Sequence, residues 1–349
     1  MRITLIDESV PFDGRSPATV PLGGPEKAFA ELATALARAD HQVVALNRVA
    51  EAVTVEGVDW RPLAEAVSSG PTDLLIALRK PRLLALVAEA GRRVLWCTGD
   101  AARLDRAANR NALARYRPHL AFLGPNQAER WRGRVDVPVS VIRPGVAKTF
   151  LDAGPLDPTC PPRAVVTSHP ARGLDWLIKL WTGSLHPALP SARLEVYSAV
   201  LSGGLAGRPV PESLRPLLGA VLDAQDKGVV VRPPLGDTGM AEAFARARVH
   251  LYPGAPEDTF CYSLTETQAC GLPAVARPLG AAGEVIVNGE TGYLAPDDPA
   301  FVNLALMILR DDDCFAGLST EARDRQRKRG WDEVAHLFAT LVHDARSAA

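Results

Sequence analysis

Two acidic residues in the segment EDTFCYSLTETQACGLPAV, residues 257–275, have types and a spacing that suit ligand chemistry. Asp258 follows the apolar run VHLYP, and Glu266 comes eight residues later, where a helix is expected to begin. The start of a helix offers unpaired backbone N–H groups to a phosphate, and a carboxylate in its first turn can accept two hydrogen bonds from a diol such as a ribose. We therefore expect Glu266 to bind a ribose, Asp258 to bind a sugar, and backbone N–H groups to bind phosphate.

The same spacing also has an ordinary structural interpretation. Ser263 and Glu266 form the S-x-x-E pattern of a capping box, which predicts a helix that begins at Ser263. Gly271 and Pro273 would end this helix after barely two turns. A capping box does not explain the small and aromatic residues that follow Asp258. We therefore expect a ligand-binding segment that consists of Phe260, Cys261, Tyr262, Ser263 and Leu264.

The elements that must position these residues alternate between strands and helices. Near-continuous apolar runs, typical of parallel strands buried on both faces, occur at 2–7, 42–47, 73–78, 93–97, 120–124 and 139–144. A second series occurs at 164–168, 193–198, 228–233, 249–253 and 273–278. Segments between them, such as 24–39, repeat apolar residues at helical spacing. Two α/β series predict two doubly wound, Rossmann-like sheets that face each other across a cleft, with ligands at the carboxyl ends of the strands.

A segment rich in proline and glycine separates the two series. The stretch AKTFLDAGPLDPTCPPR lacks periodicity and is predicted to be the linker. We expect a first domain over residues 1–155 and a second over residues 160–330. The pattern WDEVAHLFATLV follows the polar run EARDRQRKRG and predicts a C-terminal helix, within 331–349, that packs back on the first domain.

Composition excludes several classes of protein. The chain has 349 residues, too many for one compact core, and a net charge of -1, which argues against a nucleic-acid partner. MRITLIDES is typical of a strand rather than a signal peptide, and no apolar run approaches the ~18 residues of a membrane-spanning helix. The five cysteines lack metal-ligand spacing, which favours reduced thiols in a cytoplasmic protein.

The two-acid segment resembles the signature of the family-4 glycosyltransferases, which are retaining enzymes of the GT-B fold. That signature is a glutamate, Gly-Phe-Gly, four residues, and then Glu-Ala-Met-Ala-x-Gly-x-Pro-Val-Val. Asp258 stands in place of the first glutamate, and the matching residues are Phe260, Glu266, Ala269, Gly271, Pro273 and Val275. The segments VIRPGVAKTF and GAAGEVIVNGETGYLAPD also resemble family segments in the same order. The resemblance therefore covers most of the chain.

Two further segments place residues of the implied site. PLGGPEKAFAELATALARADHQVVAL resembles the family's first glycine-rich loop and helix, where Gly23 and Gly24 would let the backbone approach the diphosphate or the acceptor. A plain strand-to-helix turn with Pro25 at the first helical position is the alternative. TSHPARGLDWL resembles the segment that opens the second domain, with Arg172 in place of a lysine. Guanidinium binds phosphate in a bidentate manner, so we expect Arg172 to bind the diphosphate, while His169 either assists it or forms a turn.

Acidic residues elsewhere have two interpretations. Asp100 follows the strand after which many family members carry a histidine near the transferred sugar. It is expected either to contact the sugar or acceptor, or to cap the next helix. The runs at 297–298 and 311–313 suggest a metal site by composition, but neither follows a strand into the cleft. We expect these runs to be surface acids, and no metal ligands are assigned.

Two basic clusters are also open to two interpretations. One cluster follows the strand at 73–78 and would bind an anionic acceptor, such as a lipid-linked phosphate, or form a solvated turn; it comprises Arg79, Lys80 and Arg82. The other would form one basic helix face, either solvated or in contact with an anionic membrane; it comprises Arg103, Arg106 and Arg110.

The resemblance implies transfer of a sugar from a nucleotide-diphosphate sugar, as co-substrate, to an acceptor hydroxyl with retained anomeric configuration and without a metal or cofactor. Arg172 and the helix start would stabilise the leaving diphosphate, and Asp258 would orient the sugar. The acceptor would be a glycan, a lipid-linked sugar or a small molecule, as in polysaccharide biosynthesis, with peripheral contact at the inner membrane face as an option. An inactive or donor-binding relative and a nucleotide-sugar epimerase are the alternatives. A periplasmic-type binding protein is disfavoured, because no signal peptide is recognised.

Overall fold

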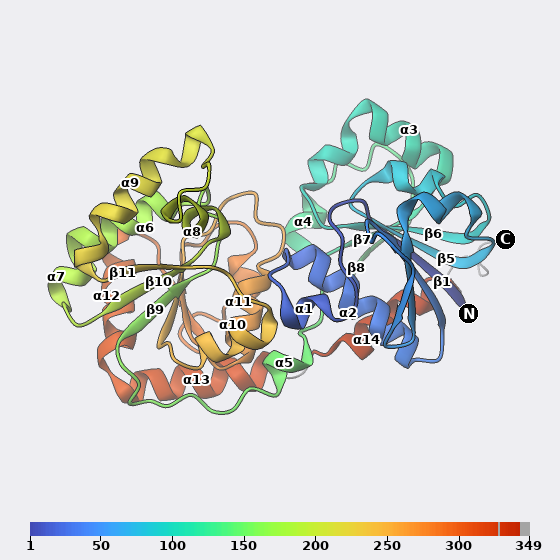
Figure 1. The fold of residues 1–349 in the computed structure, drawn as a ribbon. Helices are drawn as coiled ribbons and strands as arrows, with labels where there is room; N and C mark the ends of the chain where they lie inside the picture. Colours follow the sequence, from blue (N-terminus) through green and yellow to red (C-terminus); the bar gives the residue numbers. More distant parts are fainter. Residues whose placement is uncertain (327–328, 343–349) are drawn as a thin grey trace. The chain divides into compact units, whose positions relative to one another are not determined.

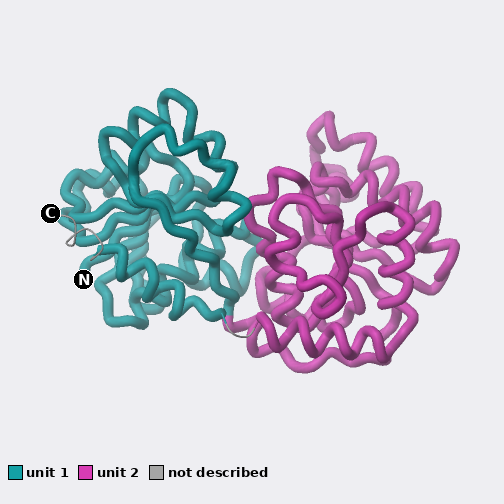
Figure 2. Tube along the Cα trace, turned by 180° about the vertical axis from the view of Figure 1, so that it is seen from behind, with its two compact units in different colours: residues 1–147, 329–349 teal, residues 148–328 magenta. Residues whose placement is uncertain are grey.

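A computed structural model describes residues 1–326 and 329–342. The chain forms two compact units, residues 1–147 with 329–349, and residues 148–328 (Figure 2). The unit boundary lies earlier than the sequence suggests, because helix α5 (Lys148–Leu151) belongs to the second unit rather than the first. Phe150 of this helix is fully buried, and its ring packs against Phe244 of the second unit at 6.1 Å between centroids. Burial of one large aromatic ring therefore decides the assignment of this segment.

The first unit contains an eight-stranded sheet with the strand order β3-β4-β2-β1-β5-β6-β7-β8 (Figure 1). All neighbours are parallel except β3 and β4. The strands are β1 (Arg2–Ile6), β2 (Gln42–Asn47), β3 (Val53–Val55), β4 (Val58–Pro62), β5 (Thr72–Leu78), β6 (Ala90–Cys97), β7 (His119–Phe122) and β8 (Val139–Val141). The six apolar runs of the sequence correspond to β1, β2, β5, β6, β7 and β8. They are recognisable because a central parallel strand is apolar on both faces.

The hairpin of β3 and β4 does not appear among the predicted elements. Its two-residue connection, Glu56-Gly57, has positive φ at both positions, 50° and 79°. This is the conformation of a tight hairpin turn that suits the twist of antiparallel strands. The hairpin alternates polar and apolar residues instead of forming one apolar run, so a search for buried parallel strands misses it.

The C-terminal segment packs on the first unit, where α14 (Trp331–Thr340) lies against α2 (Gly24–Arg38) (Figure 1). Trp331 and Phe338 pack edge-on against Trp96 of β6, with ring centroids 6.3 and 5.1 Å away. The predicted continuation of this helix beyond 342 lies outside the described residues. The other helical segments of this unit are α1 (Ser16–Thr19), η1 (Leu63–Ser68), η2 (Pro81–Ala85), η3 (Ala101–Asp105), α3 (Ala107–Tyr116) and α4 (Pro125–Glu129).

The second unit contains a six-stranded parallel sheet with the order β11-β10-β9-β12-β13-β14. Its strands are β9 (Arg163–Val166), β10 (Arg193–Tyr197), β11 (Val229–Arg232), β12 (Val249–Tyr252), β13 (Ala274–Ala276) and β14 (Gly292–Leu294). Besides α5, its helical segments are α6 (Leu174–Leu180), η4 (Trp181–Leu185), α7 (His186–Ala188), α8 (Ala199–Leu205), η5 (Glu212–Leu214), α9 (Arg215–Asp223), η6 (Gln225–Lys227), α10 (Asp237–Phe244), α11 (Tyr262–Ala269), η7 (Ala282–Glu284), α12 (Asp298–Arg310) and α13 (Asp312–Gln326).

Among the described helices of both units, none has the length and apolar character needed to cross a membrane.

The chain reverses its direction of travel across each sheet once. In the first unit this happens between β1 and β5, and in the second between β9 and β12. Loops that leave the carboxyl ends of two such strands diverge, and in doubly wound sheets ligands bind at this point. Each unit therefore has one position where the fold itself favours a binding site.

His250 of β12 ties together the elements around the reversal in the second unit. Its ring is fully buried, with Nδ1 2.9 Å from the hydroxyl of Thr267 in α11 and Nε2 3.3 Å from the hydroxyl of Thr167 after β9. Burial lowers the pKa of His250 to about 3. The folded chain therefore keeps this imidazole neutral at pH values where the unfolded chain protonates it.

We predict that replacing His250 with glutamine flattens the dependence of stability on pH. The pKa of His250 is lowered on folding, so its contribution is complete above the unfolded value near 6.5 and is lost as the pH falls toward about 3. One such group lowers the free energy of unfolding by at most about 1.4 kcal/mol per pH unit in this window. Urea denaturation at several pH values between 7 and 4.5 measures how the free energy of unfolding depends on pH, with His186→Gln in the same unit as the control. Parallel profiles for the parent and His250→Gln would contradict the prediction.

Candidate active site in the second unit

Asp258 is a buried carboxylate whose two oxygens are both engaged by protein donors. The residue is 1% exposed. The hydroxyl of Tyr252 and the backbone N–H of Ala255 donate to Oδ2 at 2.9 and 3.0 Å, and Nη1 of Arg172 pairs with Oδ1. Burial, together with the adjacent Cys261 and Asp258, raises the pKa of Tyr252, so its hydroxyl stays a donor. Asp258 therefore faces Arg172 and its own loop.

Arg172 joins the two loops at the reversal of the sheet. It follows β9, whereas Asp258 follows β12, and the two residues are 86 positions apart in the chain. The side chain of Arg172 is 44% exposed, so part of the guanidinium remains accessible while one nitrogen is held by the buried acid. Arg172 precedes Gly173, the N-cap of α6, which has a φ of 85°. Arg172 therefore lies just before the helix and not in its first turn.

His169 forms the turn that presents Arg172. Its Nδ1 accepts a hydrogen bond from the backbone of Ala171 at 3.2 Å, and its carbonyl accepts one from the backbone of Arg172 at 2.8 Å. Burial lowers the pKa of His169, and the charge of Arg172 lowers it further. The turn-forming interpretation of His169 is what the structure shows. A contact with phosphate stays a prediction.

Helix α11 begins one residue earlier than expected and lacks the predicted capping box. Cys261 is the N-cap and provides no side-chain hydrogen bond, which places Ser263 inside the helix, where it cannot serve as the cap. The carbonyl of Cys261 accepts the backbone N–H of Thr265 at 2.9 Å instead. At the other end, Gly271 has a φ of 84°, and Leu272 donates to the carbonyl of Thr267 at 2.9 Å, which is a Schellman motif.

One face of α11 remains accessible. Tyr262, Ser263 and Glu266 are half-buried, whereas Leu264 and its other helical neighbours are buried. The ring of Phe260 packs edge-on against Tyr262, with centroids 4.7 Å apart, and forms the preceding part of the same surface. Cys261 is fully buried, and burial raises the pKa of its thiol to about 12. Cys261 and Leu264 can thus contribute only backbone groups to a ligand, while Glu266 can contribute its carboxylate.

Three residues that support this site were not singled out by the sequence analysis. Tyr252 and His250 lie on the same side of β12, two positions apart, and brace the loop and the helix that follow. Arg277 donates to the carbonyls of Pro253 and Gly254 at 2.5 and 3.0 Å and stacks over a tryptophan ring. Polar residues within the apolar run VHLYP were the available signal for two of the three.

Gly280 closes against the Asp258 loop in a conformation that only glycine tolerates there. Its φ is 55°, and a Cβ at this position would lie 2.5 Å from the carbonyl oxygen of Ala255 and 2.8 Å from that of Asp258. Gly289 also has a positive φ, 83°, but a Cβ there would meet no atom of the described residues within 4 Å.

This pair of glycines allows a matched test of how tightly the Asp258 loop is packed. Both substitutions by alanine carry a backbone cost of about 1–2 kcal/mol. We expect Gly280→Ala to lower the free energy of unfolding by a further 1–3 kcal/mol or so, because the added methyl group is overpacked. Chemical denaturation of both variants measures the difference, and equal losses would show that the loop yields to the added atom.

The predicted site residues of the first unit have structural roles. Asp100 caps η3 by accepting the backbone N–H of Ala102 at 3.2 Å, as its capping interpretation requires. Gly23 is the N-cap of α2, and Gly24 is its first residue. A carboxylate oxygen of Glu26 occupies the space that a Cβ of Gly23 would need. The glycine thus accommodates Glu26, and the predicted approach of a diphosphate or acceptor is untested.

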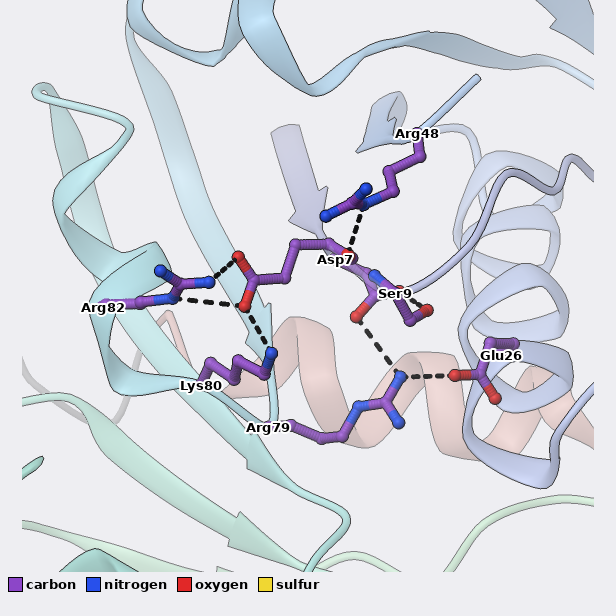
Figure 3. Close-up of polar contacts among 8 residues, drawn as sticks. Asp7, Ser9, Glu26, Arg48, Arg79, Lys80 and Arg82 are labelled. Carbon is purple, nitrogen blue, oxygen red and sulfur yellow. Dashed lines mark hydrogen bonds and ion pairs between the residues drawn. The ribbon is translucent and has the colours of Figure 1, made fainter. Parts of the chain in front are cut away.

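The basic turn after β5 is not merely solvated. Arg79 pairs with Glu26 at 2.5 Å and with Asp7 at 3.4 Å (Figure 3). Lys80 and Arg82 pair with Glu8. The other predicted basic face is wrong, because Arg106 is the extended N-cap of α3 and separates Arg103 in η3 from Arg110.

The acidic runs also have structural partners. Asp297 caps α12, and Asp298 accepts a hydrogen bond from the indole of Trp176 at 3.0 Å. Asp312 pairs with the buried Arg248 at 2.7 Å, so it is more than a surface acid. Across residues 1–326 and 329–342, no cluster of three or more His, Cys, Asp or Glu side chains could hold a metal ion.

Comparison with known proteins places this site in a family. The family model described as "Glycosyl transferases group 1" matches residues 164–311, which include Arg172, Asp258 and Glu266. The D-inositol 3-phosphate glycosyltransferase of Xylanimonas cellulosilytica is 30% identical over 219 residues, which are 59% of this chain and 51% of that protein. The family match and this relative support assignment of the chain to the family-4 glycosyltransferases.

A further relative is similar in sequence, and solved structures are similar in fold. The phosphatidyl-myo-inositol mannosyltransferase of Mycobacterium leprae is 29% identical over 133 residues, 38% of this chain and 34% of that one. Sucrose-phosphate synthase from Thermosynechococcus elongatus superposes over all of both chains, with a TM-score of 0.77 at 16% identity. Anabaena HepE with UDP and glucose covers 99% of each chain, with a TM-score of 0.72 at 13% identity. The fold class is GT-B, as predicted. The chain spans about half the length of the glycosyltransferases that it matches first in sequence.

Proposed function

We propose that this family-4 protein transfers a sugar from a nucleotide-diphosphate sugar to an acceptor hydroxyl, with retained anomeric configuration. The observation that carries the proposal is Arg172, a half-accessible guanidinium fixed by a buried carboxylate at the carboxyl ends of β9 and β12. A fixed cation at the reversal of a doubly wound sheet suits a diphosphate. The family match over the same residues supports this choice of ligand.

In this proposal Arg172 and the start of α11 bind the diphosphate. Both stabilise negative charge that develops on the leaving group, and they are in place before the reaction begins. Glu266, on the accessible face of α11, binds the ribose. HepE in its complex with UDP and glucose offers the fold-level parallel for such a donor.

Asp258 acts in this proposal through Arg172. The sequence suggested a direct contact with the sugar, but both carboxylate oxygens are already engaged and the residue is 1% exposed. A buried carboxylate that holds one guanidinium nitrogen fixes the orientation of the others. We therefore assign Asp258 as a positioning residue for the diphosphate clamp.

The acceptor is proposed to carry an anionic group. The relatives' names state inositol 3-phosphate, phosphatidyl-myo-inositol and L-malate, and each of these molecules contains a phosphate or a carboxylate. The acceptor is then either a small molecule or a lipid-linked one, and the lipid case brings with it peripheral contact with a membrane.

A screen of nucleoside diphosphates for thermal stabilisation tests the donor half of the proposal. A ligand at about 100 times its dissociation constant stabilises a protein by about 2.7 kcal/mol. We expect at least one nucleoside diphosphate to do so, and Glu266→Gln to weaken its binding. Sugar transfer to an acceptor, unaffected by a chelator, distinguishes the transferase from an epimerase. If no nucleotide stabilises the chain, the proposal fails, and binding without any transfer would identify a donor-binding relative.

The positioning role of Asp258 predicts coupling between Asp258 and Arg172 in nucleotide binding. Arg172→Ala and Asp258→Asn should each weaken the binding of the nucleoside diphosphate, and the double variant should be no weaker than Arg172→Ala. The coupling energy between neighbours of this kind is about 1 kcal/mol or more. Calorimetry on the folded variants measures it. If Asp258→Asn binds the diphosphate normally but turns over slowly, Asp258 contacts the sugar instead.

A further inference from the structure

A second charged site lies at the reversal of the sheet in the first unit. Asp7 and Glu8 follow β1, Arg48 follows β2, and residues 79–82 follow β5. These three strands are adjacent in the order β2-β1-β5, so their carboxyl ends share one edge of the sheet. We call the set Glu8, Arg48, Lys80 and Arg82 the Glu8 cluster, and its three cations are labelled in Figure 3.

Three cations of the Glu8 cluster contact a single acidic residue. Lys80 Nζ lies 2.6 Å from one oxygen of Glu8, and Arg82 Nη2 lies 2.5 Å from the other. Arg48 donates from Nε to the backbone carbonyl of Glu8 at 2.7 Å, and no carboxylate of the described chain pairs with it. The side chain of Glu8 is 10% exposed, while those of Lys80 and Arg82 are 54% and 72% exposed. The acid therefore lies beneath its cations, which face outward.

The neighbouring Arg79 does not reduce this positive charge, because it has acids of its own. Asp7 and Glu26 are nearly buried and both pair with Arg79. The backbone of Arg79 has a φ of 63°, and Lys80 N–H donates back to the carbonyl of Leu78 at 2.6 Å, which is a tight γ-turn. This strained turn directs Arg79 toward Asp7 and Glu26 and leaves Lys80 and Arg82 to Glu8. The Glu8 cluster itself carries three positive charges and one negative charge.

We propose that the Glu8 cluster binds the anionic group of the acceptor, a phosphate or a carboxylate. This inference rests on the proposed glycosyl transfer and names the acceptor's class and its anchoring residues. The guanidinium groups of Arg48 and Arg82 retain N–H donors that protein acceptors do not use. Such donors bind an oxyanion with charge-assisted hydrogen bonds. Glu8 keeps Lys80 and Arg82 in place before the anion arrives, which lowers the entropic cost of binding.

Protection of Lys80 from acetylation tests this site at the level of one residue. The full chain is treated with an amine-acetylating reagent, and each lysine is quantified by mass spectrometry. Lys148, which is exposed and paired with Asp152, is the matched control. We expect inorganic phosphate, but not chloride at equal ionic strength, to slow acetylation of Lys80 at least threefold and to leave Lys148 unchanged.

A second arm of the experiment distinguishes a soluble anion from a lipid headgroup. Vesicles of phosphatidylinositol in phosphatidylcholine are compared with vesicles of phosphatidylcholine alone. Protection by phosphate supports a soluble acceptor, and protection only by the phosphatidylinositol vesicles supports a lipid-linked one. If neither phosphate nor phosphatidylinositol protects Lys80 beyond its chloride or phosphatidylcholine control, the inference is overturned.

Charge-removing variants provide the quantitative test. Arg48→Gln and Arg82→Gln should each raise the concentration of the protecting anion needed for half-protection by about tenfold, the size expected for one charge-assisted hydrogen bond. Arg38→Gln removes an equivalent exposed, acid-paired arginine of the same unit and should leave it unchanged. If all three variants need the same anion concentration for half-protection of Lys80, the inference is overturned. Nucleotide binding by the parent chain is measured separately. If the parent binds a nucleotide but no anion protects its Lys80, this site alone is refuted and the proposed function is not.

Discussion

The reversal of chain direction within each parallel sheet is the constraint on which both charged sites depend. A parallel sheet places the carboxyl ends of all its strands on one edge, and the reversal makes two neighbouring loops diverge there. In the second unit this brings Arg172 to Asp258 across 86 positions of sequence. In the first unit it brings residues after β1, β2 and β5 together. Neither arrangement requires the charged residues to be near one another in the chain.

The ion pair of Arg172 and Asp258 serves geometry more than stability. Removing a carboxylate from water is costly, and a pair whose other partner is accessible recovers only part of that cost. The chain offsets this with two further donors to Asp258, from Tyr252 and Ala255. The result is a cation with a defined direction, which is the property that recognition of a planar or tetrahedral oxyanion requires.

The sequence predicts the scaffold well because buried parallel strands are apolar on both faces, and the apolar runs of both units are indeed strands. It fails where two local patterns compete. S-x-x-E at Ser263 satisfies the capping-box spacing, yet the helix starts at Tyr262, because Cys261 already supplies the first carbonyl. Arg79 looks like part of a solvated turn until the fold brings Asp7 and Glu26 beside it. Spacing along the chain does not reveal partners that only tertiary structure supplies.

The start of α2 has a consequence for selectivity. A helix of this length normally attracts an anion to its first turn, but here Glu26 places its own carboxylate in the space beside Gly23 and is paired with Arg79. The carboxylate of Glu26 therefore takes the position at the start of α2 that a ligand anion would otherwise occupy. A ligand phosphate that approaches this end must displace a tethered carboxylate, whereas Arg48 beside Glu8 is paired with no carboxylate of the described residues. The first unit thus has two neighbouring places that attract negative charge, the start of α2 and the Glu8 cluster. Because Glu26 already occupies the first, a ligand anion is directed to the second.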